Sequence, residues 1–373
     1  MNPQKVFCPN IECPAKGRRD SKNIEIHSRV EKRYMCTVCG KSFSGTKGTI
    51  FYGLRTDPKI VIQVVTLQAY GCPSQAIVQA FGLDERTVKK WHERAGDHCQ
   101  ALHEHIVEES QLDLQQVQAD EIKAKMQGRH VWIALAIMVS TRLWLGGVIS
   151  ERRDKGFIEA LAAKVRKVAR CRPLLLAVDG LVTYVGAFQR AFRSPLPKHG
   201  APGRPRLVAW PDIVIVQVVK KRSAKQFDIM RRIVQGAPEQ VAELLQISQG
   251  RGVINTAYIE RLNATFRQRV APLSRRNRCP AQQEATLTAG MYIVGCFYNF
   301  CDYHHSLRIG LWITNWRRHW VQQTPAMAAA LTDHRWSPDE LFWFKIPPPA
   351  WTPPKRRGRP SKQMLELIET WAS

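Results

Sequence analysis

Three short segments carry acidic residues in an otherwise strongly basic chain of 373 residues. They are residues 118–121, 176–180 and 255–261, which contain Asp120, Asp179 and Glu260. The chain has 56 Lys and Arg against 31 Asp and Glu, and its net charge of +25 is typical of proteins that bind nucleic acid. Carboxylates oppose phosphate binding, but they supply the oxygen ligands that divalent cations need in phosphodiester chemistry. Taken singly, each acid is also consistent with a solvated or ion-paired carboxylate.

Four of the ten cysteines are clustered near the start of the chain. Cys8 and Cys13 form a Cys-x4-Cys pair, Cys36 and Cys39 form a Cys-x2-Cys pair, and this spacing favours one tetrahedral zinc site. The segment between the pairs is rich in β-forming residues and predicts a β-hairpin. A domain of about 40 residues buries little core, so the zinc ion would supply much of its folding energy. The alternative is four unrelated thiols, and whether such a ribbon contacts DNA or protein partners is left open.

Residues 57–96 predict a helix-turn-helix, with a turn at Gly82 and an N-cap at Asp84. The expected buried positions of its two helices are Ile77, Phe81, Leu83, Val88 and Trp91. The exposed positions of the second helix include Arg86, Lys89 and Lys90. Basic side chains early in a recognition helix suit docking in the major groove of DNA. A plain helical hairpin with a solvated charged face is the alternative.

The pattern changes to strands from about residue 113. Strands are expected at residues 114–120, 131–138 and 143–149, a helix at residues 153–168 and a buried strand at residues 174–178. Strand, strand, strand, helix, strand is the element order of the RNase H-like fold. In this order Asp120 lies at the end of the first strand, and Asp179 directly follows the fourth.

A further helix is predicted from Asn255, which is its candidate N-cap. Its apolar stripe comprises Ile259, Leu262, Phe266 and Val270. Glu260, Asn263 and Arg267 share another face of this helix. The preceding residues 193–254 are interpreted as an insertion that contains a basic loop and one strand-like stretch.

These motifs together resemble the DDE insertion-sequence transposases, specifically the InsA/InsB type with a zinc ribbon, a helix-turn-helix and an RNase H-like catalytic domain. The most specific similarity is Asn-Thr-Ala-Tyr-Ile-Glu-Arg-Leu-Asn-Ala-Thr-Phe-Arg at residues 255–267. Further similar stretches are residues 45–55, Ala119-Asp120-Glu121, Val178-Asp179-Gly180 and the segment that ends at Arg308. The resemblance covers roughly residues 6–310, although the gap between Asp179 and Glu260 is longer than in compact members.

By this resemblance Asp120, Asp179 and Glu260 are the catalytic triad and hold two Mg²⁺ ions, with Mn²⁺ as an alternative. Two such ions, about 3.5–4 Å apart, hold the attacking and leaving oxygens of an in-line displacement. Asp120 would bridge both ions, and the other two acids would each bind one. Two alternatives stay open, namely Glu121 in place of Asp120, and Glu284 as the last acid of a different fold.

Basic residues near the triad and in the tail are candidate DNA contacts. Arg261, Asn263 and Arg267 are expected to contact phosphates or the DNA backbone near the cut. The Arg-Gly-Arg-Pro motif of the tail, with Arg357 and Arg359, resembles an AT-hook, which lies in the narrow minor groove of A·T runs. The alternative is a basic tail that only increases solubility.

The predicted multidomain α/β organisation comprises a zinc ribbon at residues 1–46, a helix-turn-helix domain at residues 57–110, a catalytic domain at residues 113–310 with an insertion at about residues 193–254, and a C-terminal extension at residues 311–373. The implied partners are transposon-end DNA, target DNA and at least one further copy of the chain, since two ends must be brought together. No signal peptide or membrane span is expected, because the long uncharged runs are interrupted by polar residues. The implied location is the bacterial cytoplasm, at the nucleoid. The alternatives are a DNA-binding regulator with an inactive catalytic domain, and an RNase H-like nuclease or resolvase.

Overall fold

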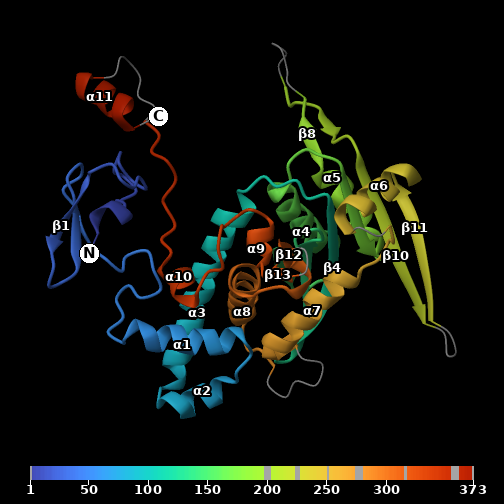
Figure 1. Cartoon of the computed structure of the whole chain (residues 1–373), viewed down its shortest axis with the longest axis horizontal. Helices are drawn as coiled ribbons and strands as arrows, with labels where there is room; N and C mark the ends of the chain where they lie inside the picture. Colours follow the sequence, from blue (N-terminus) through green and yellow to red (C-terminus); the bar gives the residue numbers. More distant parts are fainter. Residues whose placement is uncertain are drawn as a thin grey trace. The chain divides into compact units, whose positions relative to one another are not determined.

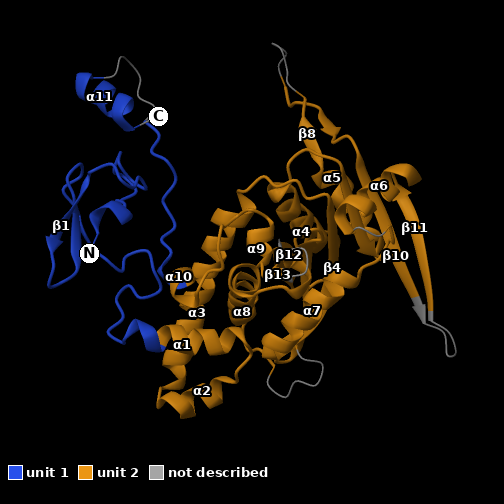
Figure 2. Ribbon diagram, in the orientation of Figure 1, with its two compact units in different colours: residues 1–60, 342–373 blue, residues 61–341 orange. Residues whose placement is uncertain are grey.

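The computed structural model describes residues 2–196, 203–222, 227–249, 252–273, 280–314, 317–353 and 361–371. The chain divides into two compact units, which are coloured separately in Figure 2. The first unit comprises residues 1–60 and 342–373, and the second comprises residues 61–341. The tail motif with Arg357 and Arg359 lies outside the described residues.

The first unit contains a three-stranded antiparallel sheet beside the clustered cysteines. Its strands are β1 (Ile24–Ser28), β2 (Arg33–Cys36) and β3 (Ser42–Ser44), and the short 3-10 helix η1 (Pro3–Lys5) precedes them. β1 and β2 pair in an antiparallel register with Ile24 opposite Cys36, so the predicted hairpin is confirmed. The buried core of this sheet consists of Val6, Cys8, Cys13, Ala15, Ile24, Tyr34, Cys36 and Phe43. The thiols of Cys8, Cys13 and Cys36 are therefore part of the apolar core of this small sheet.

The end of the chain belongs to the same unit as its beginning. The ring of Trp343, the last residue of α10 (Pro338–Trp343), lies 4.5 Å from the ring of Phe51. Trp371, the last residue of the C-terminal helix α11 (Lys362–Trp371), packs against the core of the three-stranded sheet. Arg18 also donates a hydrogen bond to the backbone oxygen of Trp371 at 2.9 Å. The C-terminal helix is thus a structural component of the first unit.

The segment predicted to form a helix-turn-helix contains the helices α1 (Pro58–Ala69), α2 (Ser74–Phe81) and α3 (Glu85–His103). Gly82 ends α2 in the left-handed conformation, with a φ of 60°, as glycine permits. Asp84 caps α3 by accepting a hydrogen bond from the backbone N–H of Arg86 at 2.8 Å. Of the expected buried positions, Ile77, Val88 and Trp91 are buried, whereas Phe81 and Leu83 are half-buried.

The second half of α3 packs into the core of the second unit. A Cβ atom on Gly96 would lie 2.3 Å from the Cβ of Ala289 in α8 (Glu284–Cys296), so only glycine permits this close approach. α3 continues into the π-helical turn η2 (Glu104–Glu108). The helix that carries the basic residues of the predicted recognition surface is therefore also a core helix.

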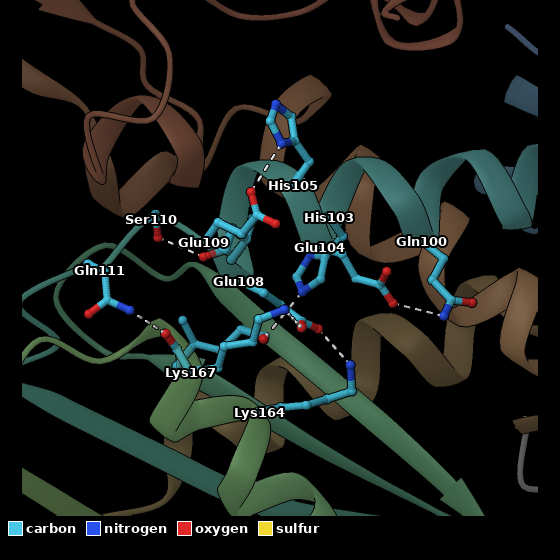
Figure 3. Close-up of polar contacts among 12 residues, drawn as sticks. Gln100, His103, Glu104, His105, Glu108, Glu109, Ser110, Gln111, Lys164 and Lys167 are labelled. Atoms are coloured by element: carbon cyan, nitrogen blue, oxygen red, sulfur yellow. Dashed lines mark hydrogen bonds and ion pairs between the residues drawn. The ribbon is translucent and has the colours of Figure 1, made fainter. Parts of the chain in front are cut away.

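A partly buried polar cluster links η2 to α4 (Lys155–Val168), as Figure 3 shows. The carboxylate of Glu108 accepts hydrogen bonds from the ammonium groups of Lys164 at 2.6 Å and Lys167 at 3.2 Å. His103 is fully buried next to this cluster, and burial lowers its pKa to about 4, so it stays neutral at pH 7. The ion pairs of Glu108 with Lys164 and Lys167 therefore link the turn η2, which follows α3, to α4.

The second unit is built on a six-stranded mixed sheet with the order β11-β10-β7-β4-β5-β6. The strands are β4 (Gln116–Met126), β5 (Arg129–Met138), β6 (Trp144–Ser150), β7 (Leu174–Asp179), β10 (Ile213–Arg222) and β11 (Phe227–Gln235). β7 is parallel to β4 and β10 is parallel to β7, while the other neighbours are antiparallel. This mixed sheet is compatible with an RNase H-like fold.

Asp120 lies inside β4 rather than at its end, which corrects the predicted position. The parallel pairing of β4 with β7 ends at Ala119 opposite Val178, but the antiparallel pairing with β5 continues to Met126. Ile122, Ala124 and Met126 are buried and alternate with exposed lysines, so the extension keeps one face in the core. The strand continues because β5 supplies a partner for it.

Helices cover both faces of the sheet (Figure 1). α6 (Pro238–Gln249) packs on the apolar residues of β7 and β10, and α7 (Ala257–Arg269) contacts β4 and β5. α5 (Val182–Ala191) packs against α4, and its Tyr184 reaches Glu121 of β4. Because side chains alternate along a strand, Glu121 and Asp120 point to opposite faces of β4.

The segment 193–254, interpreted as an insertion, also contributes to the central sheet. β10 pairs with β7 from Ile213 opposite Leu174 to Val218 opposite Asp179. The hairpin of β8 (Arg193–Pro195) and β9 (Leu207–Ala209) forms a separate two-stranded sheet. The remaining short elements are η3 (Ala271–Leu273), η4 (Phe297–Cys301), η5 (His305–Leu307), β12 (Ile309–Thr314), β13 (Arg317–Val321) and α9 (Pro325–Ala328).

Candidate metal centres

Two aspartates meet where the parallel pairing of β4 and β7 ends. Asp120 and Asp179 directly follow Ala119 and Val178, the last pair of residues that joins the two strands. A pocket of about 510 Å³ opens at this point. Its charged lining residues are Asp120, Asp179, Glu260, Arg153 and Lys220. The three predicted acids therefore line one pocket, although they come from β4, β7 and α7.

α7 is held in place by Gln118, a buried residue of β4. The side-chain oxygen of Gln118 accepts hydrogen bonds from the backbone N–H groups of Tyr258 and Ile259, both at 3.0 Å. Its side-chain nitrogen donates to the backbone oxygen of Asn255 at 2.7 Å. The N–H groups in the first turn of a helix have no partner within the helix, and Gln118 satisfies two of them. Since Gln118 and Asp120 share one face of β4, this contact fixes Glu260 relative to Asp120.

The N-cap of α7 is Thr256, not Asn255, which corrects the predicted start of the helix. The side-chain oxygen of Asn255 instead accepts a hydrogen bond from the backbone N–H of Ala257 at 3.0 Å. Asn255 thus stabilises the turn that precedes the helix. The predicted apolar stripe of α7, comprising Ile259, Leu262, Phe266 and Val270, is buried.

Asp120 is the most perturbed acid of the pocket. Asn263 of α7 is buried and donates a hydrogen bond from Nδ2 to Oδ2 of Asp120 at 2.8 Å. Burial, followed by the negative charges of Asp179 and Glu260, raises the pKa of Asp120 to about 7. The ionised pocket thus carries negative charge that its surroundings do not fully stabilise, and a bound cation would remove this cost.

Glu260 enters the pocket from the first turn of α7. Its side chain forms an ion pair with Lys220 of β10 and accepts a hydrogen bond from the hydroxyl of Thr256 at 2.7 Å. Burial acts to raise the pKa of Glu260, but the bonds from Lys220 and Thr256 outweigh it and lower the pKa overall. Glu260 is therefore ionised at neutral pH, with Lys220 as its counter-charge.

Glu121 lies close to the two aspartates. Ligand oxygens of Asp120, Glu121 and Asp179 all lie within 4.8 Å of one another. The side chain of Glu121 is only 3% exposed, forms an ion pair with Arg153 and accepts a hydrogen bond from the hydroxyl of Tyr184 at 2.8 Å. Glu121 therefore stays open as an alternative ligand. Glu284, the other alternative, lies at the first position of α8 and is not among the residues that line the pocket.

The chemistry of the acidic pocket suits a hard divalent cation, because carboxylate oxygens are the ligands that such ions prefer. The sequence matches no protein-family model, and no curated protein matches it either. The side chains of the pocket and of the cysteine cluster are therefore the basis for assigning a function.

The four cysteines of the first unit form a second candidate metal centre. The sulfur atoms of Cys8 and Cys39 lie 3.7 Å apart, and those of Cys13 and Cys36 lie 3.8 Å apart. Four sulfur ligands about 2.3 Å from a tetrahedral zinc ion are themselves about 3.8 Å apart. Burial raises the pKa of the Cys13 thiol to about 12, so this thiol stays protonated unless a metal displaces the proton. The predicted cluster is confirmed, and its geometry is suitable for zinc.

The predicted DNA contacts lie on two helices. Arg86, Lys89 and Lys90 are exposed on α3, and Arg261 is exposed on α7. Arg267 is half-buried on α7, and its charge lowers the pKa of Asp120. Asn263 differs from the other candidates, since it is buried against Asp120. No helix in the described parts of the chain is long and apolar enough to cross a membrane.

Several residues that build the pocket were not predicted, namely Gln116, Gln118, Arg153 and Lys220. Gln116 accepts hydrogen bonds from Ser248 and Gln249 at the end of α6, both at 2.7 Å, as Gln118 does from α7. The sequence does contain a signal for the two glutamines. In the run Gln-Val-Gln-Ala-Asp polar and apolar residues alternate, so on a strand both glutamines point to the same face as Asp120. The two glutamines share one face of β4, where they are buried and hydrogen-bonded to α6 and α7, as buried polar groups require.

Proposed function

We propose that the chain is a DDE transposase, which cleaves DNA at insertion-sequence ends and joins the 3′-hydroxyl to target DNA. The observation that carries the proposal is the pocket that Asp120, Asp179 and Glu260 line together with Arg153 and Lys220. A pocket of this kind on a chain with a net charge of +25 suits a phosphodiester substrate. The sheet, in which β7 and β10 run parallel to β4 and β5 runs antiparallel to its neighbours β4 and β6, supports an RNase H-like catalytic domain.

Asp120, Asp179 and Glu260 would hold two Mg²⁺ or Mn²⁺ ions. Bound ions supply Lewis-acid stabilisation to the attacking and leaving oxygens of the phosphodiester. The protein orients two of these carboxylates through hydrogen bonds. Asn263 holds Oδ2 of Asp120 at 2.8 Å, and the backbone N–H of Leu181 holds Oδ1 of Asp179 at 2.9 Å. This orientation limits the rearrangement that cation binding requires.

Arg153 and Lys220 are proposed to contact phosphate oxygens of the DNA. Arg153 is fixed by its ion pair with Glu121 and by the ring of Trp132, whose centre lies 4.8 Å from the guanidinium carbon. A guanidinium group in a fixed orientation suits a phosphate, which has several acceptor oxygens. The side chain of Lys220 is 37% exposed, so it can reach solvent-facing phosphates once a cation neutralises Glu260.

The remaining parts of the chain are proposed to select the DNA. The exposed basic residues of α3 would read the ends, and the four cysteines would hold one structural zinc ion. At least two copies are needed, because two DNA ends must be joined to one target. Such a reaction takes place on the bacterial chromosome, in the cytoplasm.

The proposal is tested with linear DNA that carries the sequences flanking the gene, a supercoiled plasmid as target, and Mg²⁺ or Mn²⁺. Products in which the linear DNA is joined to the plasmid support a transposase. Cleavage without joining would indicate an RNase H-like nuclease or resolvase instead. Specific binding without any metal-dependent cleavage would indicate a DNA-binding regulator.

A further inference from the structure

A second two-stranded sheet of the second unit carries large exposed side chains. β12 and β13 pair with each other and belong to a sheet separate from the central one. In their register Gly310 lies opposite Trp320, and Trp312 lies opposite Arg318. A two-stranded hairpin is only marginally stable in water by itself. Large exposed apolar side chains on such a hairpin are typical of a surface that binds a partner.

Two tryptophans share one face of this hairpin. Trp312 lies two positions from Gly310 on the same strand, so its side chain and that of Trp320 point to the same side. Trp312 is 67% exposed and Trp320 is 39% exposed. The guanidinium of Arg308 lies over the Trp320 ring, 4.0 Å from its centre. The face thus combines exposed aromatic rings with a positive charge.

The charge around the hairpin indicates an anionic partner. No Asp or Glu occurs in the sequence between Asp302 and Asp333, whereas Arg308, Arg317 and Arg318 lie in this stretch. Aromatic rings beside arginine stack on nucleobases, and each stacked base adds appreciably to affinity. The bases of an intact duplex are stacked on one another, so only unpaired nucleotides present their faces to a tryptophan.

We propose that Arg308, Trp312 and Trp320 form a stacking surface for unpaired nucleotides of DNA. The inference rests on the proposed function for the choice of DNA as the polymer. It assigns to the hairpin a role that the acidic pocket does not supply, namely holding the single strand that is exposed when an end is opened.

The test measures binding of the full-length protein to a single-stranded oligonucleotide and to the duplex of the same sequence, by fluorescence anisotropy. Trp312→Ala should weaken single-strand binding about ten-fold or more and leave duplex binding nearly unchanged. Trp312→Phe should keep most of the affinity, since it keeps an aromatic face. Leu311→Ala is the matched control, because Leu311 is 51% exposed and points to the opposite face of the hairpin.

A second measurement avoids variants that fail to fold. A 2-aminopurine base in the single strand should lose fluorescence when the wild-type protein binds, because it stacks on an indole ring. Unquenched fluorescence at saturation, or equal losses on single strand and duplex, would overturn the proposal. The proposal would also be overturned if Trp312→Ala lowered the oligomeric mass in light scattering but left single-strand binding unchanged. In that case the face binds a second copy of the chain. If these results overturn the stacking surface but the protein still joins DNA in a metal-dependent reaction, the proposed function stands and only the role of the hairpin is wrong.

Discussion

The side-chain oxygen of Gln118 accepts the backbone N–H of Ile259 at 3.0 Å, so the strand that carries Asp120 also fixes the first turn of the helix that carries Glu260. The pocket is therefore assembled by a buried amide that belongs to neither of the acids. This contact joins two segments that are 141 positions apart in the chain. It gives the relative position of two candidate ligands a physical cause.

Gln118→Ala should reduce both stability and metal affinity. The substitution removes the acceptor of the N–H groups of Tyr258, which is half-buried, and Ile259, which is buried, and a buried group without an acceptor costs about 1–3 kcal/mol. We expect a loss of about 2–4 kcal/mol in the free energy of unfolding, together with weaker Mn²⁺ binding in calorimetry. Gln127→Ala, in the exposed turn between β4 and β5, is the control. Equal behaviour of the two variants would show that Gln118 does not position α7.

Asp120→Asn should stabilise the metal-free protein at alkaline pH. Asp120 titrates near 4 in an unfolded chain but has a pKa of about 7 in the folded protein. Between these values the folded protein retains a proton that the unfolded chain has lost, so stability due to this group falls as the pH rises from about 4 to about 7. The amide side chain of the variant is neutral throughout, and the advantage of the variant should grow over this interval to at most about 4 kcal/mol.

Thermal unfolding at pH 5 and pH 8, with and without Mn²⁺, measures this effect. Added Mn²⁺ should stabilise the wild type at pH 8 and have little effect on Asp120→Asn. A variant that is less stable than the wild type at pH 8 without metal contradicts the raised pKa. Asp113→Asn is a suitable control, because Asp113 is exposed and precedes β4.

The purified protein should contain about one zinc ion per chain by elemental analysis. Cys36→Ser should unfold the first unit and leave the second folded, because Cys36 is buried in the core of the ribbon. Since Trp371 packs on this core, limited proteolysis should then also release α11. Cys171→Ser, at an exposed thiol, should behave like the wild type. A zinc-free protein with a protease-resistant first unit would rule out a metal-dependent ribbon.

Arg86→Ala should reduce affinity for the specific end by about 1–3 kcal/mol and affinity for scrambled DNA much less. Arg86 is exposed in the first turn of α3, where a recognition helix reaches base edges. Lys90→Ala should instead weaken binding to all DNA and reduce the slope of the salt dependence by about one. Titrations on end and scrambled DNA at several salt concentrations distinguish the two effects. If Arg357→Ala removes the preference for the end and Arg86→Ala does not, the tail rather than α3 reads the sequence.

Local patterns in the sequence predicted much of the second unit. Gly82 and Asp84 are local signals for the end of one helix and the start of the next, and both act as predicted. The buried run before Asp179 forms a central strand, as its apolar composition indicates. The four cysteines also come together as their spacing predicts.

Features that depend on contacts between distant residues could not be predicted. The packing of Trp371 on the core of the three-stranded sheet and the ion pairs of Glu108 with α4 join segments with no shared motif. The extension of β4 beyond Asp120 depends on its partner β5. The pairing of Glu260 with Lys220 likewise becomes visible only when β10 and α7 are placed together.

The central claim is that Asp120, Asp179 and Glu260 hold the metal ions that catalyse phosphodiester transfer. The most direct measurement compares joining of flanking-sequence DNA by Asp120→Asn, Asp179→Asn, Glu260→Gln, Glu121→Gln and Glu284→Gln. The first three variants should lose joining entirely while they bind DNA as the wild type does, because each lacks a ligand of one shared centre. Glu284→Gln should be fully active, and Glu121→Gln should keep measurable activity. Joining by any of the first three at more than a few per cent of wild type, or loss of joining in Glu121→Gln with full activity in Glu260→Gln, would contradict the assignment.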